Sequence, residues 1–225
     1  MAEILQRFKQ PITIIGGGEF VPEIFNNSLK IAPELIAVDG GINYLNPNIH
    51  TPKWIIGDLD SAQNTEAWAK VGTKIKHLPE QEKTDFEKCL YSIEATAYFA
   101  NGFLGHRVDH TLAACSTLVK NKGKNIILLG KRDLIVHVNR KIILELEVGT
   151  RLSLFPFQKV SGVKSLGLKY SISGLFFSPE SRIGTSNEVI STTVEISFDG
   201  PGILLILPIK CLFEVAELYK FNLGS

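Results

Sequence analysis

The chain has 225 residues, a net charge of +1 and a hydrophobic content of 44%, an ordinary composition for a globular protein that can bury a full core. The balanced charge excludes a broad basic field for nucleic acid, so any anion must bind at a local cluster. The apolar run at residues 203–207 is too short to span a bilayer, and the N-terminus lacks the apolar core of a signal peptide. Three cysteines lie far apart, which favours a reducing compartment over a disulfide scaffold or a zinc site. We therefore expect a cytoplasmic protein without nucleic-acid or membrane partners.

The first part of the chain alternates short apolar runs with segments of helical character. Strands are expected at residues 11–15, 35–38, 54–56, 74–78 and 126–129. Helices are expected at residues 64–71, 85–100 and 111–122. Thr84 is a candidate N-cap for the longest of these helices, in which Phe86, Leu90, Ile93 and Ala97 follow helical spacing. The alternation predicts an α/β domain with a mostly parallel sheet that is covered on both faces.

The pattern changes after about residue 133, where short strand-like runs alternate with turn residues. Strands are expected at residues 135–138, 141–146, 151–155, 167–171, 192–198 and 202–208, and a helix at residues 212–219. Regularly spaced strands of this kind predict an all-β sandwich or barrel. We place the boundary near residue 135, which gives an α/β domain at 1–135 and an all-β sandwich domain at 136–225.

Three aspartates directly follow predicted strands. Asp39 ends the run at 35–38, and Asp58 and Asp60 follow the run at 54–56. Open α/β sheets bind ligands at the carboxyl ends of their strands, and like charges that meet there repel unless a cation joins them. Carboxylate oxygens suit Mg²⁺, which in turn suits a polyphosphate. The alternative is a loop in which the aspartates only cap the next helix.

Two other segments of the first domain carry polar side chains suited to phosphate chemistry. Asp85 at a helix start is either a further metal ligand or an acid that complements the helix dipole, and Gln81 or Lys83 could reach phosphate oxygens. In the segment 102–110, Arg107 can grip phosphate in a bidentate way and Asp109 can orient it, although a plain loop with a helix cap is also open.

Glycines and small polar side chains mark two weaker candidates. Gly16-Gly17-Gly18 follows a predicted strand and would let backbone amides approach a phosphate, or it is a plain tight turn. Residues 184–188, in the C-terminal half, suit recognition of a polar heterocycle, although a turn is the plainer interpretation.

Together these motifs resemble those of the thiamine pyrophosphokinase family. The matching stretches occur in the family's order and span most of the chain. They are Val38-Asp39-Gly40-Gly41, Gly57-Asp58-Leu59-Asp60-Ser61, residues 81–90, residues 105–110 and Thr185-Ser186-Asn187-Glu188. Singly they are weak, but in combination they are specific.

The resemblance implies a fold, an activity and an assembly. The fold is an N-terminal α/β catalytic domain that binds ATP and metal, followed by a C-terminal β-sandwich that binds thiamine. The activity is Mg²⁺-dependent transfer of a pyrophosphoryl group from ATP to the hydroxyethyl oxygen of thiamine, giving thiamine diphosphate and AMP. The assembly is a homodimer whose active site lies between the catalytic domain of one subunit and the sandwich of the other.

The matched positions also imply roles for individual residues. Asp58, Asp60 and Asp85 would hold Mg²⁺, with Asp39 nearby, and Arg107 would complete the catalytic set. Asp39 or Asp85 would take the proton from the attacking hydroxyl. The remaining implied contacts are to the nucleotide and to thiamine. The residues implied for the nucleotide are Gln81, Thr84, Arg107 and Asp109, and Asp109 would support its loop or the substrate. The residues implied for thiamine are Ser186 and Asn187.

Two positions depart from the family pattern. The family's loop commonly reads Gly-Gly-Arg-x-Asp, and here His106 stands at the second glycine. Some members stack thiamine on a tryptophan of the C-terminal domain, whereas the tryptophans here are Trp54 and Trp68. A diphosphokinase that acts on another alcohol, such as a hydroxymethylpterin, and a non-catalytic nucleotide or thiamine sensor are the alternative functions.

Overall fold

The computed structural model describes residues 3–220 and divides into two compact units. The N-terminal unit comprises Met1–Thr117 with Leu128–Lys131, and the C-terminal unit comprises Leu118–Ile127 with Arg132–Ser225. The short strand β8 (Ile126–Leu129) and the helix α4 (Val108–Lys120) contribute residues to both units.

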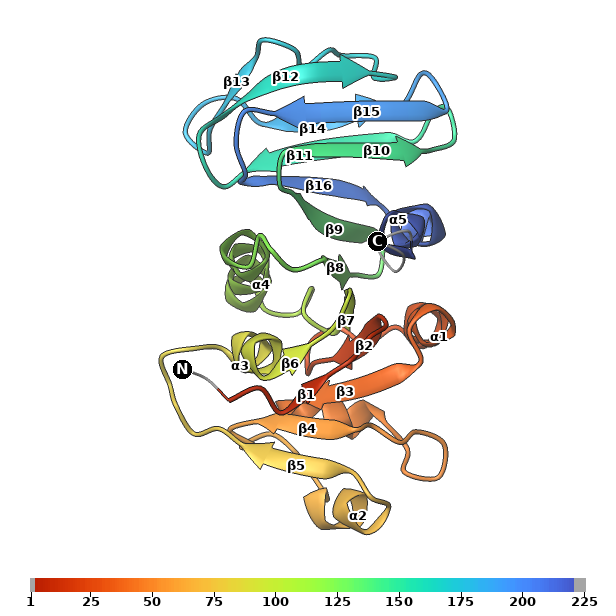
Figure 1. Cartoon of the computed structure of the whole chain (residues 1–225), viewed down its shortest axis with the longest axis vertical. Coiled ribbons are helices and arrows are strands. Elements are labelled where there is room, and N and C mark those ends of the chain that lie inside the picture. The colour runs from red at the N-terminus through yellow and green to blue at the C-terminus, as the bar shows by residue number, and fades with distance from the viewer. Residues whose placement is uncertain (1–2, 221–225) are drawn as a thin grey trace. The chain divides into compact units, whose positions relative to one another are not determined.

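A parallel sheet forms the centre of the N-terminal unit (Figure 1). Its strands, in spatial order, are β7 (Tyr98–Asn101), β2 (Ile12–Ile15), β3 (Glu34–Val38), β4 (Trp54–Gly57) and β5 (Lys74–His77). All four pairings between these neighbours are parallel. Every residue of β2 and β7 is buried, including the polar residues Thr13 and Asn101, so these strands lie within the core.

The order of these strands fixes where a ligand can bind. From β2 the chain proceeds outward through β3, β4 and β5, and then returns to place β7 on the other side of β2. The segment that follows β2 therefore leads to β3 on one side of it, whereas β7 lies on its other side, so the loops after β2 and β7 run in opposite directions. Such a switch point opens a crevice outside the carboxyl ends of the strands.

Helices pack onto this sheet and complete its core. α1 (Pro22–Ile31) contacts β2 and β7, α2 (Thr65–Lys70) contacts β5, and α3 (Asp85–Ser92) contacts β3 and β4. One core cluster joins Phe25 of α1 and Trp68 of α2 to apolar residues of β2, β3 and β4. A 3-10 helix, η1 (Asp39–Tyr44), follows β3 directly, and a small parallel pair joins β1 (Gln6–Arg7) to β6 (Ile93–Glu94).

The predicted helix at residues 85–100 is wrong in its second half. α3 ends at Ser92, and Ile93 is extended with φ −120° and ψ 128°. The chain then forms β6 and β7. A short apolar run fits a buried strand as well as a helix, and Ala97 continued the helical spacing by coincidence. The helix α1, which opens with Pro22 in its first turn, was not predicted.

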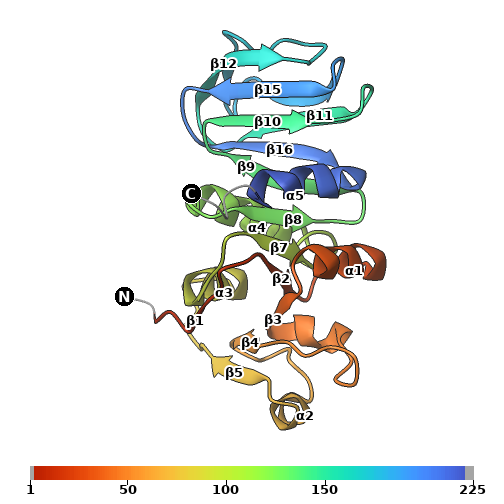
Figure 2. The same ribbon diagram turned by 45° about the vertical axis from the view of Figure 1, so that its right-hand side comes forward.

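Two antiparallel sheets form the C-terminal unit. The first has β14 (Gly184–Glu188), β11 (Arg151–Pro156), β16 (Ile203–Pro208) and β9 (Asp133–Val138). The second has β10 (Lys141–Glu145), β15 (Thr193–Phe198), β12 (Val160–Leu166) and β13 (Phe176–Phe177). A 3-10 turn, η2 (Ile209–Cys211), leads to α5 (Leu212–Lys220), which packs against β10 (Figure 2).

One strand prediction in the C-terminal unit is wrong, and three strands of this unit were not predicted. Residues 167–171 form no strand and make only an isolated bridge between Leu168 and Val189. β12 and β13 were not predicted, and residues 184–188 form strand β14 instead of a turn. The predicted fold class, an α/β unit with a mostly parallel sheet followed by an antiparallel all-β unit, is confirmed.

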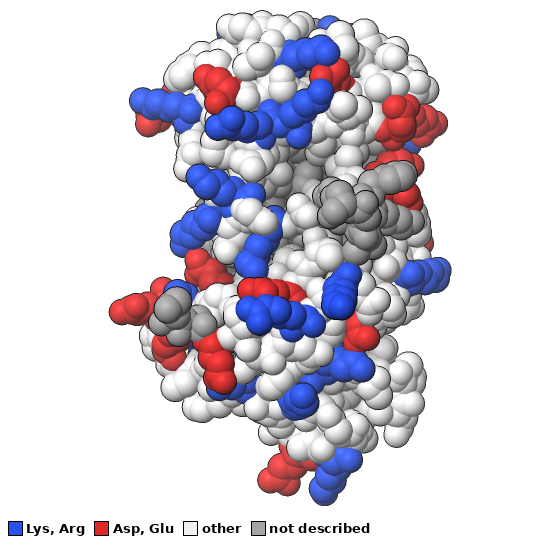
Figure 3. Space-filling view, viewed as in Figure 1, with Lys and Arg blue, Asp and Glu red and all other residues white. Residues whose placement is uncertain are grey.

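Surface charge and helix length agree with the composition. On the face shown in Figure 3, acidic and basic side chains lie interspersed, as expected from the net charge of +1. Within residues 3–220, every helix is too short or too polar to cross a bilayer.

Candidate active site

A cavity of about 600 Å³ lies in the N-terminal unit at the switch point of the sheet. Its lining comes from the segments that follow β2, β3, β4 and β7, together with the start of α3. Gly16, Asp39, Asp58, Asp85 and Arg107 are among the lining residues. Most of the candidate phosphate and metal residues therefore line one cavity, because they follow strands that end at one edge, whereas Asp60 and Asp109 are not among its lining residues.

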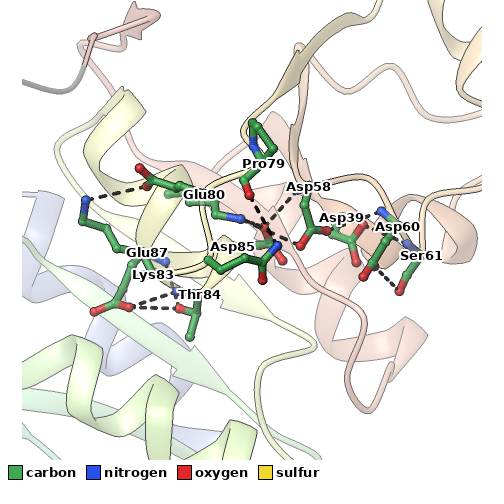
Figure 4. Close-up of polar contacts among 12 residues, drawn as sticks. Asp39, Asp58, Asp60, Ser61, Pro79, Glu80, Lys83, Thr84, Asp85 and Glu87 are labelled. Atoms are coloured by element: carbon green, nitrogen blue, oxygen red, sulfur yellow. Dashed lines mark hydrogen bonds and ion pairs between the residues drawn. The ribbon is translucent and has the colours of Figure 1, made fainter.

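Asp39, Asp58 and Asp60 converge at one point of this edge (Figure 4). One carboxylate oxygen from each lies within 4.8 Å of the others. The turn that brings Asp58 and Asp60 together passes through Leu59, which has a left-handed φ of 62°. The Ser61 backbone N–H donates to Asp39 Oδ1 at 3.3 Å, and the Ser61 hydroxyl donates to Asp60 Oδ1 at 2.9 Å. Three hard oxygen ligands at this separation suit an ion such as Mg²⁺.

The electrostatics of Asp39 also fit a cation. Burial raises the pKa of Asp39, and the nearby charges of Asp85 and Asp60 raise it further. Hydrogen bonds from the Gly40 and Ser61 backbone lower it but do not offset the rise. The cluster thus holds more negative charge than its own hydrogen bonds compensate, which a bound divalent ion would balance.

Asp85 is joined to this cluster through Asp58 and Lys88. Thr84 caps α3 in a capping box with Glu87, so the predicted N-cap is confirmed and Asp85 is fixed at the first helical position. Asp85 Oδ1 accepts a hydrogen bond from the Asp58 backbone N–H at 3.1 Å and another from Lys88 Nζ at 2.8 Å. One of its oxygens is therefore occupied, and Asp85 stands outside the group of three converging carboxylates.

Glycines form the floor of the cavity. The Gly18 backbone N–H donates to Gly102 O at 2.7 Å, and a Cβ on Gly102 would lie 2.3 Å from Gly16 O. Tyr44, at the end of η1, donates its hydroxyl to Gly18 O at 2.8 Å and stacks on Phe20 at a centroid distance of 4.9 Å. The glycine segment predicted to approach phosphate is therefore held against two neighbouring elements.

Arg107 and Asp109 form a bidentate pair, with Nε–Oδ1 at 3.1 Å and Nη2–Oδ2 at 2.6 Å. The hydrogen bond from Arg107 lowers the pKa of Asp109 to about 2, and Asp109 in turn raises the pKa of Arg107. Both side chains are exposed, so the guanidinium can also reach a ligand in the cavity that Arg107 lines. His106 has a left-handed φ of 48°, which explains why glycine suits this position in the family's loop.

Gln81 and Lys83 line the cavity from the segment between β5 and α3. Glu80 in this segment accepts a short hydrogen bond from the hydroxyl of Tyr91 on α3, and this bond lowers the pKa of Glu80. Lys83 Nζ lies 3.6 Å from Glu80 and 4.8 Å from the centre of the Tyr91 ring. These contacts tie the segment to α3.

Ser186 and Asn187 lie on β14 in the C-terminal unit, whereas the residues that line the cavity belong to the N-terminal unit. Asn187 is buried, and its side chain bonds the Tyr170 backbone, accepting from N–H at 3.0 Å and donating to O at 2.7 Å. Ser186 has a φ of 60°, and its N–H donates to Ser153 Oγ at 3.0 Å. Asn187 thus has a structural role within its own unit.

Sequence reasoning missed Asn43 and gave no role to Lys88. Asn43 Nδ2 donates to Ser61 O at 2.8 Å, and Asn43 Oδ1 accepts from the Gln63 N–H at 2.9 Å, which ties η1 to the turn after β4. Lys88 is buried beside two of the aspartates. The sequence signal that could have identified Lys88 is its position three residues after Asp85, which places the two side chains next to each other on a helix.

Two family models match the chain. The thiamin pyrophosphokinase catalytic domain matches residues 25–129, and the thiamin pyrophosphokinase vitamin B1 binding domain matches residues 137–203. Thiamin pyrophosphokinase 1 of Caenorhabditis elegans is 33% identical over 178 residues, which cover 71% of this chain and 72% of the relative.

Solved structures share the fold. Yeast thiamin pyrophosphokinase has a TM-score of 0.76 at 17% identity, with 96% of this chain and 95% of that chain covered. Thiamin pyrophosphokinase from Geobacillus thermodenitrificans has a TM-score of 0.74 at 22% identity, with 88% of this chain and 97% of that chain covered.

These matches define the class of the protein, which is an enzyme of the transferase type. The chain belongs to the thiamin pyrophosphokinase family. Its activity is that of an ATP:thiamine diphosphotransferase, and the predicted family and function are confirmed.

Proposed function

We propose that this cavity binds ATP with Mg²⁺ and that Asp58, Asp60 and Asp85 hold the ion, with Asp39 beside them. The observation that carries the proposal is the convergence of Asp39, Asp58 and Asp60 within 4.8 Å, together with Asp85, which is joined to Asp58 by the hydrogen bond from the Asp58 N–H at 3.1 Å. The raised pKa of Asp39, caused by burial and by neighbouring acids, supports a site built for a cation. When bound, Mg²⁺ neutralises phosphate oxygens and so makes the β-phosphorus open to attack.

The side chains of the cavity then position the reactants. Gln81, Thr84 and Arg107 contact the triphosphate, and the glycine floor, which carries no side chains, lets it approach the backbone closely. Asp109 holds Arg107 in its bidentate pair, with Nη2–Oδ2 at 2.6 Å. Asp39 accepts the proton of the attacking thiamine hydroxyl, because one oxygen of Asp85 is already bonded to Lys88. Catalysis in this scheme comes from positioning and charge stabilisation.

The thiamine site and the assembly follow from the family likeness. We assign Ser186 and Asn187 of β14 to the thiamine-binding surface, where the exposed Ser186 contacts the substrate and the buried Asn187 shapes the strand. We further propose a homodimer in which the sandwich of one subunit, residues 136–225, completes the site in the catalytic domain, residues 1–135, of the other. A cytoplasmic location agrees with the buried cysteines Cys89, Cys115 and Cys211, which form no disulfide.

The substitution Asp60→Asn tests the metal role. It removes one carboxylate charge with almost no change in shape, and we expect kcat for AMP release from ATP and thiamine to fall at least about 100-fold. Glu66→Gln on α2 is the matched control, because this exposed carboxylate lies outside the cluster of Asp39, Asp58 and Asp60. Near-normal turnover of a folded Asp60→Asn variant refutes the role. Replacing thiamine by hydroxymethylpterin in the wild-type assay tests the alternative substrate, for which we expect no AMP release.

A further inference from the structure

A fully buried lysine lies among the acids of the active site. Lys88 is 1% exposed, although a lysine ammonium is seldom removed from water. Its Nζ lies 2.8 Å from Asp85 Oδ1 and 3.9 Å from Asp58 Oδ2. A buried charge persists in a fold only where opposite charge compensates it, and these two carboxylates supply that charge.

The fold explains how one lysine reaches two acids on different elements. Lys88 lies three residues after Asp85, so both side chains project from the same face of α3. α3 packs against β4, and Asp58 follows β4 directly. The backbone N–H of Asp58 also donates to Asp85 Oδ1 at 3.1 Å. The Lys88 ammonium and the Asp58 amide therefore bind the same Asp85 oxygen, which locks the start of α3 to the end of β4.

The charges of the cluster define the role of this lysine. Asp39, Asp58 and Asp60 converge at one point, and Lys88 is buried beside Asp58 and Asp85. The other cations of the cavity wall, Lys83 and Arg107, are largely exposed. Water screens their charges strongly, whereas the charge of Lys88 acts on the cluster at close range.

We propose that Lys88 is a positioning residue that acts as an internal counter-cation, holding Asp58 and Asp85 in place for the metal and weakening the intrinsic affinity of the site for it. The proposal rests on the assignment of Asp58 and Asp85 as metal ligands. Because the ammonium repels a second cation nearby, its removal strengthens metal binding in the nucleotide-free protein. The same removal frees Asp85 from its fixed orientation, so turnover falls.

The test measures metal affinity apart from activity. The probe is Mn²⁺, which takes the same oxygen ligands and whose free ion gives an EPR signal, titrated into nucleotide-free protein. We expect Lys88→Met to bind Mn²⁺ at least about five-fold more tightly than wild type. Lys83→Met removes the same charge from an exposed position of the same cavity, so its affinity stays within about two-fold of wild type. Lys88→Arg keeps the charge and restores the wild-type affinity.

The outcomes separate this proposal from the metal site itself. If Asp58→Asn weakens Mn²⁺ binding but Lys88→Met leaves it unchanged or weaker, the counter-cation role is wrong and the metal site stands. If neither substitution alters Mn²⁺ affinity, the metal site is wrong. Should Lys88→Met fail to fold, Lys88→Gln serves the same comparison, because its amide can still donate to Asp85. Thermal unfolding gives a second readout, since Mn²⁺ should raise the Tm of the neutral variant more than that of wild type.

Discussion

Among the glycines that form the floor of the cavity, Gly102 is the one at which an added Cβ would make the shortest contact. It follows β7 with a left-handed φ of 73°, and a Cβ there would lie 2.3 Å from the carbonyl oxygen of Gly16. Gly102→Ala therefore introduces two separate penalties, one from the backbone conformation and one from the collision. Gly72 provides the matched control in the same unit, since its φ is 91° and nothing lies within 4 Å of its Cβ position.

The magnitudes follow from these two geometries. An alanine held in the left-handed region costs about 1–2 kcal/mol, offset by about 0.4–1 kcal/mol because the unfolded chain loses freedom. Gly72→Ala should thus lower the free energy of unfolding by about 1 kcal/mol. Gly102→Ala adds an overpacking cost of about 1–3 kcal/mol, because backbone atoms at Gly16 must move. We expect a total loss of about 3 kcal/mol for Gly102→Ala.

Urea unfolding of both variants measures the difference directly. The loss for Gly102→Ala should exceed that for Gly72→Ala by about 2 kcal/mol. The KM for ATP should rise only in the Gly102 variant, because the displaced glycines change the wall of the cavity in which we propose that ATP binds. Equal losses in the two variants would show that the close approach of Gly16 and Gly102 does not restrict this position.

Three further substitutions address α3 and the C-terminal unit. Thr84→Ala removes the side-chain acceptor for the Glu87 N–H at 3.3 Å and should lower the free energy of unfolding by about 1 kcal/mol, measured in urea. Tyr91→Phe breaks the bond to Glu80 and frees the segment after β5, so KM for ATP should rise several-fold while kcat changes little. Burial, followed by the charge of a nearby lysine, lowers the pKa of His137 from 6.5 to about 4. Protons therefore bind the unfolded chain more tightly between these values, and stability should fall as the pH drops from 6.5 towards 4, less steeply in His137→Gln.

The parallel strands could be predicted because burial on both faces leaves a plain signal. β2, β3 and β4 consist mostly of apolar residues, and glycine or aspartate stands at or directly after their ends. The convergence of Asp39 and Asp58 followed from the rule that parallel strands end at one edge. The strand β7 was lost because its sequence, Tyr-Phe-Ala-Asn, continues the helical spacing of α3.

Features that depend on tertiary contacts could not be predicted in the same way. β14 contains Thr185, Ser186 and Asn187, which favour turns, and it forms a strand because it pairs with β11 and because the Asn187 side chain bonds Tyr170. The burial of Lys88 depends on how α3 packs against β4, and sequence spacing gives only its distance from Asp85 along the helix. Contacts between elements that are distant in sequence thus determine both the strand β14 and the burial of Lys88 beside the aspartates.

A left-handed backbone conformation at non-glycine residues also could not be predicted from the sequence. Two such residues allow a comparison of glycine substitutions. Leu59 and His106 both have positive φ beside the cavity, at 62° and 48°. Leu59 packs against the core cluster, whereas His106 is exposed. Replacement by glycine removes a conformational cost of about 1 kcal/mol at each site but adds a similar entropy to the unfolded chain. His106→Gly should therefore be neutral within about 0.5 kcal/mol, whereas Leu59→Gly also loses buried apolar surface and should cost about 1–2 kcal/mol in urea unfolding. If the two losses are equal, the imidazole of His106 makes a stabilising contact, and glycine in the family's loop serves something other than backbone conformation.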